Sequence, residues 1–190
     1  MTRLVASALA ALVLAAPAMA QDRAPFTGAR IEGLAGWDRI QGGGGHDDDI
    51  GYGVGIGYDM QVGSALVGLE GEITDSNNKT CSGAATTLDP RLCLKAARDL
   101  SVGGRFGAVV GGNTLLYAKL GYTNARTKLT RDDGSLRTTL GRADLDGVRI
   151  GGGAEFALNR NMFAKAEYRY SNYEQGMERH QVMGGVGLRF

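Results

Sequence analysis

The chain has 190 residues, of which 21 are Lys or Arg and 20 are Asp or Glu, so its net charge is close to zero. This balance excludes the strongly basic surface that is typical of nucleic-acid-binding proteins, and the length suits one domain. Glycine supplies 31 residues and proline only 3, without a collagen-like triplet repeat. Because the glycines lie inside alternating segments, they do not form a disordered linker.

The first twenty residues are organised like a secretory signal peptide. Arg3 supplies a positive charge, the segment 4–16 is apolar, and Ala18-Met19-Ala20 matches a small-residue cleavage site. The apolar segment is too short for a membrane helix, which needs roughly 20 residues. We therefore expect that residues 1–20 are removed after export and that residues 21–190 form the mature domain.

Eight segments show the two-residue alternation of β-strands, roughly 26–39, 50–59, 65–74, 98–109, 114–124, 146–157, 162–171 and 180–190. Short turns near 61–64, 111–113 and 158–161 alternate with long connections near 40–49, 75–97, 125–145 and 172–179. Membrane barrels combine short periplasmic turns with longer outer loops. The pattern predicts an all-β fold, an eight-stranded antiparallel up-and-down transmembrane β-barrel with both termini on the periplasmic side.

Alternation alone also fits a soluble barrel with an apolar interior. Three features favour a membrane barrel over a soluble one. They are glycines at the polar alternate positions from Gly51 to Gly57, an aromatic residue at the final position, and aromatics near the strand ends. The expected outer girdle contains Trp37, Tyr52, Tyr122, Tyr168 and Tyr170. The expected periplasmic girdle contains Phe26, Tyr58, Phe106, Phe156 and Phe190.

The inward parity then carries seven positive and five negative side chains: Arg30, Glu32, Glu70, Glu72, Arg105, Lys119, Arg149, Glu155, Lys165, Glu167, Arg169 and Arg189. Charges inside a narrow barrel are costly unless they are paired. The glycines of segment 50–59 leave room for long side chains from the opposite wall. We expect a paired polar plug, and the alternative is a narrow channel in which ion pairs exchange partners.

The run Phe163 to Tyr170 and the terminal Val186-Gly-Leu-Arg-Phe190 give the chain a family resemblance. It resembles the small outer-membrane β-barrels, which include opacity-protein-like surface antigens, the transmembrane domain of outer membrane protein A and alphaproteobacterial porin-family proteins. The resemblance implies a Gram-negative outer membrane, contact with membrane lipid and lipopolysaccharide, and recognition of Phe190 by the barrel-assembly machinery. The sequence departs from the outer membrane protein A pattern in having no peptidoglycan-binding domain after Phe190, so the resemblance does not imply direct cell-wall anchoring.

Two cysteines, Cys81 and Cys93, lie in one polar segment. Export to an oxidising compartment favours a disulfide between them. A metal site would need more ligands than two thiols, and neither histidine is close in sequence. We therefore expect a disulfide and no metal or cofactor.

Some eight-stranded barrels modify lipid A with a His, a Ser and a carboxylate, so His46 and His180 are the catalytic candidates of this sequence. His180 is followed by Gln181 and Val182 and lacks the His-x-Ser arrangement of the lipid A deacylases. His46 stands beside Asp47, Asp48 and Asp49 in a glycine-rich loop without the ligand spacing of a calcium loop. The sequence therefore predicts no enzyme.

The segment 125–145 carries a basic cluster, Arg126, Lys128, Arg131, Arg137 and Arg142. It could bind lipopolysaccharide phosphates or a sulfated host glycan through charge-assisted hydrogen bonds, or be an ordinary solvated loop. Family members are structural links, adhesins, immune-evasion antigens or low-conductance pores. We expect a non-enzymatic envelope protein that displays surface loops, with a small channel and a surface adhesin as the alternatives.

Overall fold

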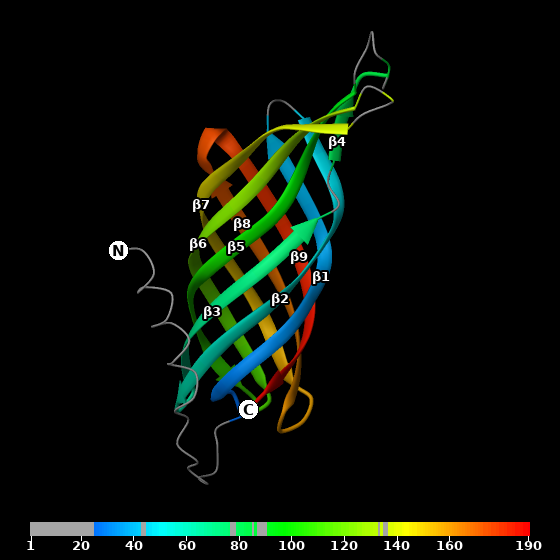
Figure 1. Ribbon diagram of the computed structural model, residues 1–190. Coiled ribbons are helices and arrows are strands. Elements are labelled where there is room, and N and C mark those ends of the chain that lie inside the picture. The colour runs from blue at the N-terminus through cyan, green and yellow to red at the C-terminus, as the bar shows by residue number, and fades with distance from the viewer. Residues whose placement is uncertain are drawn as a thin grey trace, which may run out of the picture.

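The computed structural model describes residues 25–42, 45–76, 79–84, 86, 91–132, 134 and 137–190. The expected signal peptide, residues 1–20, lies outside this part of the chain. Nearly all of the described chain is strand, wound into one tall barrel (Figure 1). Among the described residues, no helix has the length and apolar character needed to cross a membrane.

Antiparallel pairing closes the sheet on itself. The elements are β1 (Gly28–Gly42), β2 (Gly45–Val62), β3 (Ala65–Ser76), β4 (Lys79–Ser82), β5 (Arg91–Val110), β6 (Thr114–Asp132), β7 (Arg137–Ala157), β8 (Met162–Tyr173), the 3-10 turn η1 (Glu174–Gly176) and β9 (Met177–Arg189). Strand β1 pairs with β9 and β3 pairs with β5. The short strand β4 pairs only with β5, so eight strands form the wall, as predicted. Closure leaves no unpaired sheet edge in the membrane.

Tight turns join the strands at one end of the barrel. They fall at residues 63–64, 111–113 and 158–161, as the sequence predicted. Gly63, Gly111 and Gly112 adopt positive φ values of 62°, 64° and 82°, a conformation that favours glycine. The first residues of β1 and the last residues of β9 lie at this same end (Figure 1). This end is therefore the periplasmic side of the barrel.

The outer surface of the wall is apolar and the inner surface is charged. Ile56, Leu69 and Val102 are exposed by 63%, 72% and 62%, as lipid-facing side chains of an isolated barrel should be. The expected girdle aromatics are also exposed or half-buried, with one exception. Phe26 is fully buried, because it precedes β1 and turns into the barrel under the Arg189 guanidinium, 5.6 Å from the ring. The prediction of Phe26 as a lipid-facing residue was wrong.

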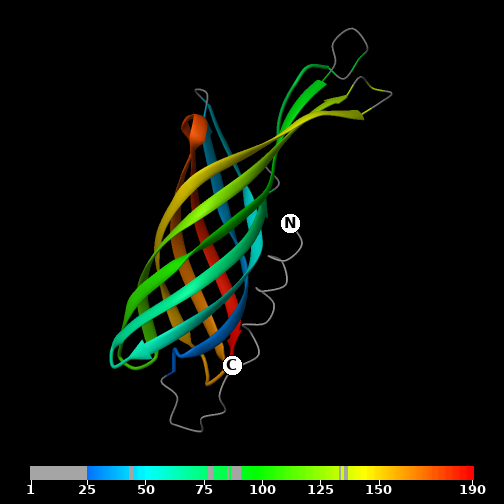
Figure 2. The ribbon, with the colours of Figure 1, turned by 60° about the vertical axis from the view of Figure 1, so that its left-hand side comes forward.

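Two of the expected long loops are largely strand. Strands β5, β6 and β7 continue past the barrel rim and lean away from it (Figure 2). We call this extension the outer arm; it comprises β4 and residues 91–96, 127–132 and 137–143. A register shift between Ala96 and Asp99 lies where β5 enters the arm, and such irregularities bend a strand. The predicted boundaries were wrong because alternation of apolar residues ends where the lipid ends, whereas backbone pairing continues.

The remaining outer connections are also shorter than expected. Strand β1 extends to Gly42 and β2 begins at Gly45, while η1 occupies much of the connection between β8 and β9. Cys81 and Cys93 form the predicted disulfide, with Cα atoms 4.1 Å apart. They are direct cross-strand partners, so the bond fastens β4 to β5 inside the outer arm.

Candidate functional site

The lumen is the most distinctive chemical feature of the molecule. All twelve charged residues that the sequence assigned to the interior are buried. Four further buried charges belong with them: Asp38, Asp59, Asp99 and Arg179. With these four, the described interior holds eight positive and eight negative side chains. The lumen is thus formally neutral, whereas the twelve predicted residues alone, seven positive and five negative, would carry a net positive charge.

Asp59 organises the periplasmic end of the lumen. Its Oδ2 atom lies 2.6 Å from Nη2 of Arg105, 3.1 Å from Nε of Arg30 and 3.1 Å from Nη1 of Arg189. Glu155 shares two of these cations, at 2.9 Å from Arg105 and 2.6 Å from Arg189. One aspartate therefore joins strands β1, β5 and β9 through three guanidinium groups.

The middle of the lumen contains two lysines and one arginine among four glutamates. The Lys119 ammonium contacts three carboxylates from strands on both sides of the barrel, and Lys165 contacts two. Glu167 also accepts a hydrogen bond of 2.5 Å from the Tyr117 hydroxyl. The contacts are Lys119 with Glu70 (2.6 Å), Glu72 (3.0 Å) and Glu167 (3.1 Å), Lys165 with Glu32 (2.7 Å) and Glu167 (3.0 Å), and Arg169 with Glu72 (2.8 Å) and Glu167.

Asp99 organises the outer end. Its carboxylate accepts hydrogen bonds from Arg149, from Arg179 at 2.8 Å, from the Tyr173 hydroxyl at 2.8 Å and from the Thr123 hydroxyl at 2.5 Å. Arg179 also donates two hydrogen bonds to Asp38, at 2.7 and 2.6 Å. Arg149 approaches Glu72 at 3.8 Å, and Arg30 binds Glu70 at 2.7 Å. The three groups of ion pairs therefore form one continuous network along the lumen.

Clusters of buried apolar side chains lie near both ends of this network. Phe26, Leu66, Leu115 and Tyr117 form a buried cluster at the periplasmic end. Ala125, Leu145 and Tyr173 form a second cluster near the outer rim. An eight-stranded barrel is just wide enough for side chains to fill it. The interior is accordingly a packed core with an ionic middle and apolar ends.

Glycines on β2 make room for charged side chains of the adjacent strand β1, and not for side chains of the opposite wall as predicted. A Cβ atom on Gly55 would lie 2.8 Å from a carboxylate oxygen of Glu32. A Cβ atom on Gly57 would lie 2.9 Å from Nη2 of Arg30. Both charged residues are the β1 partners of these glycines in the strand register. The space is therefore used by the adjacent strand, whose long side chains fold sideways over β2.

The four additional charges were not predicted, because they lie at or next to the ends of the predicted strands. Asp59 shares the parity of Gly51 to Gly57, Asp99 shares that of Arg105, and Arg179 shares that of Arg189. Asp38 likewise shares the parity of Arg30. Extending each inward parity to the ends of the predicted strands would have found Asp38, Asp59 and Asp99, whereas Arg179 lies one residue before the predicted strand 180–190 and joins β9 only in the structure.

The basic segment 125–145 is not brought together as one site among the described side chains. Arg126 donates two hydrogen bonds to Asp144, at 2.7 and 3.2 Å, and this contact lowers the pKa of the Asp144 carboxyl. Arg131 is exposed on β6. The side chains of Lys128, Arg137 and Arg142 lie outside the described part of the structure.

The histidines show no catalytic arrangement among the described side chains. Nδ1 of His180 lies 2.7 Å from the Tyr168 hydroxyl, and its ring centroid lies 5.0 Å from that of Tyr170. The side chain of His46 is outside the described residues. Within the described residues, no group of three or more His, Cys, Asp and Glu side chains could hold a metal ion.

Phe190 lies at the periplasmic end of the wall. Its side chain is 62% exposed, and its backbone N–H donates a hydrogen bond of 2.9 Å to the carbonyl of Ala29. The terminal residue is therefore joined to β1 at the seam that closes the barrel, with its ring on the lipid-facing side.

A closed eight-stranded barrel with an apolar outer surface and a charged, packed interior defines an integral outer-membrane β-barrel protein. The sequence matches the family model described as outer membrane protein beta-barrel domain over residues 7–190, and the chain belongs to this family. Membership places the protein in the outer membrane of a Gram-negative bacterium, in contact with its lipid. No curated protein matches the sequence.

Solved structures of small outer-membrane barrels share the fold. The attachment invasion locus protein Ail of Yersinia pestis, solved with the heparin analogue sucrose octasulfate, is 17% identical with a TM-score of 0.62. That match covers 86% of this chain and 99% of Ail. Neisserial surface protein A is 14% identical with a TM-score of 0.57, over 86% of this chain and 98% of the other. At these identities the likeness concerns the fold alone.

Proposed function

We propose that this protein is a non-enzymatic, closed outer-membrane barrel that contributes to envelope structure and displays the outer arm at the cell surface. The observation that carries the proposal is the lumen. Its eight cations and eight anions are all buried and join in one network, with buried apolar clusters near both ends. Opening a passage would separate buried partners, which costs several kcal/mol for each pair that is broken. A packed interior of this kind supports an anchor better than a pore.

Conductance tests this proposal against the alternative of a small channel. Refolded protein in planar bilayers is expected to give no steady current, because the ion pairs occupy the lumen along its length. A wide-pore porin added to the same bilayer serves as the positive control. Reproducible openings whose conductance rises with salt concentration would overturn the proposal of a closed barrel.

The absence of enzymatic activity is also part of the proposal. His180 contacts two tyrosines on the outer wall, at hydrogen-bond distance from one of them. A nucleophile needs a base within hydrogen-bond reach, and the described contacts of His180 include neither a serine nor a cysteine.

The exposed ring of Phe190 supports its proposed role as the end of the signal that the barrel-assembly machinery reads.

The outer arm supports the display part of the proposal. Three long strands carry it past the rim, and the Cys81–Cys93 disulfide fastens its fourth strand (Figure 2). Binding functions usually reside on segments that a rigid scaffold holds out. Among the described residues, Arg126 is engaged by Asp144, so the feature that supports a surface role here is the arm itself.

Removing the disulfide is expected to loosen the arm and leave the barrel intact. In a double variant Cys81→Ser and Cys93→Ser, loss of a bond that closes a loop of 12 residues should destabilise the arm by about 2–3 kcal/mol. Trypsin, acting at exposed arginines such as Arg91 and Arg131, should then cleave the arm tenfold to a hundredfold faster.

Heat-modifiable gel migration reports the folded barrel in the same samples, and wild-type protein treated with a reductant is the matched control. An unchanged cleavage rate would show that the disulfide does not hold the arm. Loss of the heat-modifiable band would show that the arm and the barrel are not separable.

A further inference from the structure

Phe26 is buried at the periplasmic end of the lumen although it belongs to no strand. It precedes β1 by two positions, and its side chain has no exposed surface. Gly28, the first residue of β1, has a φ of 132°, a backbone conformation that side chains rarely adopt. The chain bends at this glycine, and residues 26–27 turn from the wall into the barrel. We call these two residues the N-terminal plug.

The Phe26 ring is part of an apolar cluster that reaches across the barrel. The other buried members of the cluster are Leu66, Leu115 and Tyr117. Leu115 and Tyr117 belong to β6, which lies four strands from β1 in either direction around the wall. Strand β6 is therefore opposite the strand that Phe26 precedes. The cluster extends across the periplasmic end of the lumen rather than along one side of it.

Side chains, rather than strand pairing, hold the plug in place. Oε1 of Gln61 accepts a hydrogen bond of 3.3 Å from the N–H of Phe26, and Nη1 of Arg189 donates one to the Phe26 carbonyl. The Thr27 hydroxyl accepts the N–H of Gln61 at 3.0 Å. The paired register of β1 begins only at Gly28. Departure of the plug would therefore leave the paired wall intact.

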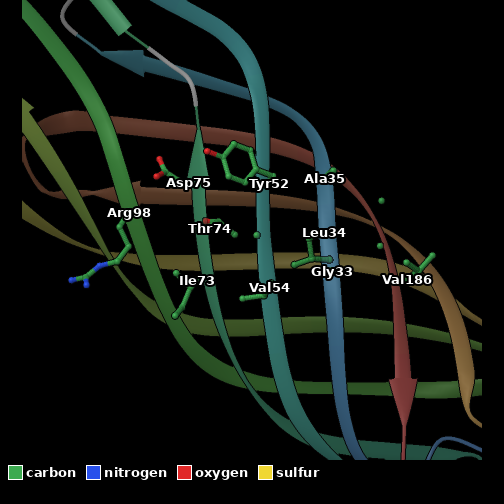
Figure 3. Close-up of a pocket in the computed structure, with 13 residues that line it drawn as sticks. Gly33, Leu34, Ala35, Tyr52, Val54, Ile73, Thr74, Asp75, Arg98 and Val186 are labelled. Carbon is green, nitrogen blue, oxygen red and sulfur yellow. The ribbon is translucent and has the colours of Figure 1, made fainter.

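The plug covers apolar surface that lipid cannot cover. On the outer wall, an apolar hollow at Gly33, between Val54 and Val186, faces the membrane (Figure 3). Hydrocarbon chains cover a surface of this kind in a bilayer. The periplasmic end of the lumen borders water instead, so its apolar side chains stay dry only if a group of the protein covers them. Phe26 is placed to supply that group.

The plug also adjoins the ion pairs at the periplasmic end. The Arg189 guanidinium lies 5.6 Å from the centroid of the Phe26 ring, and it contacts Asp59 at 3.1 Å and Glu155 at 2.6 Å. These three charged groups are buried, where attraction between charges is stronger than in water. If the plug left, water would reach Arg189 and compete for both carboxylates.

We propose that the N-terminal plug is removable: Phe26 leaves the lumen while the eight strands stay paired, and water then enters the periplasmic end as far as the Asp59 ion pairs. This inference goes beyond the proposed closed barrel, because it assigns closure of the periplasmic end to a residue outside the wall. An ordinary core residue would instead be released only when the whole barrel unfolds.

Single cysteine reporters make the plug measurable, because Cys81 and Cys93 are bonded to each other and the sequence has no further cysteine. Leu115→Cys places a thiol in the apolar cluster. Met183→Cys places one farther from the periplasmic end, on β9; both native side chains are fully buried. The protein would be refolded into detergent micelles, and the rate of alkylation by iodoacetamide, a small water-soluble reagent, would be measured. Heat-modifiable migration shows that each variant is folded, and Leu66→Cys is a second reporter of the cluster.

We expect the thiol at position 115 to react at least about tenfold faster than the thiol at position 183, because local opening is easier than global unfolding. Phe26→Ala should raise the rate at position 115 by more than about a hundredfold, since the burial of an aromatic ring is lost, and leave position 183 unchanged. Gln61→Leu should raise the rate at position 115 by roughly fivefold, because one hydrogen bond to the plug is lost. It tests the plug without a cavity if Phe26→Ala does not refold.

Phe163→Ala is the matched control. Phe163 is also buried, and the Arg189 guanidinium lies 5.5 Å from its ring, but it belongs to β8 and cannot leave without breaking strand pairing. Its loss should change the rate at position 115 little.

Equal rates at positions 115 and 183 in the otherwise unchanged protein would overturn the removable plug, because both thiols would then be reached only by global unfolding. A rise at both positions in Phe26→Ala would show that the ring holds the barrel together instead of closing its end. Neither outcome depends on the proposed closed barrel, which is tested by current: a silent barrel could lack a removable plug, and a conducting one could have it.

Discussion

Replacing Asp59 with alanine is expected to destabilise the barrel by about 3–5 kcal/mol, the cost of leaving buried charges without their partner. Arg30, Arg105 and Arg189 all contact this carboxylate within 3.1 Å and would face one another without it. Glu155 could compensate only in part, since it already contacts two of them. Urea unfolding of protein refolded in vesicles, followed by Trp37 fluorescence and gel migration, would measure the loss.

The exposed pair Arg39–Asp48 provides the control. Its N–O distance is 2.6 Å, as short as the best contact of Asp59, but the two side chains are exposed by 35% and 39%. Ion pairs exposed to water contribute roughly 0–1 kcal/mol, so Asp48→Ala should leave the unfolding midpoint nearly unchanged. If both variants unfolded at the same urea concentration, burial would not be what makes the lumen network important.

A valine at Gly153 is expected to disrupt the centre of the lumen. A Cβ atom there would lie 2.4 Å from the carbonyl oxygen of Ala166, 2.7 Å from Cβ of Glu167 and 2.9 Å from the Tyr117 hydroxyl. Overpacking typically costs 1–3 kcal/mol, and the displaced Glu167 would also lose contacts with Lys119 and Lys165. We expect a loss of at least about 3 kcal/mol in the same urea experiment, or failure to refold.

The next residue back along the same strand gives the matched control. Gly152 points to the other face of β7, and a Cβ atom there would meet only the carbonyl oxygen of Tyr117, at 3.4 Å. Valine favours strands, so Gly152→Val should be neutral or slightly stabilising. A similar loss in both variants would attribute the effect to the change of backbone flexibility rather than to contacts in the lumen.

The alternation of the sequence was enough to predict the eight strands, the three tight turns and the sides of the wall on which most residues lie. The reason is that lipid on one face and a confined interior on the other impose opposite demands on successive residues. Cys81 and Cys93 were likewise predictable, because they lie close in sequence and the signal of export favours a disulfide. The burial of Phe26 was not predictable, because a residue that precedes the first strand does not have to follow the alternation of that strand.

Two features depended on the tertiary structure alone. The outer arm could not be predicted, because its strands extend beyond the lipid and their pairing requires no apolar alternation in segments such as 127–132. The partners of the charges could not be predicted either: Lys119 meets Glu70 and Glu167 only because closure of the barrel brings β3, β6 and β8 around one lumen. The sequence by itself determined which side chains face inward, since parity is a local property of each strand. Which of them neutralise one another was decided by register and closure, which join residues far apart in the chain.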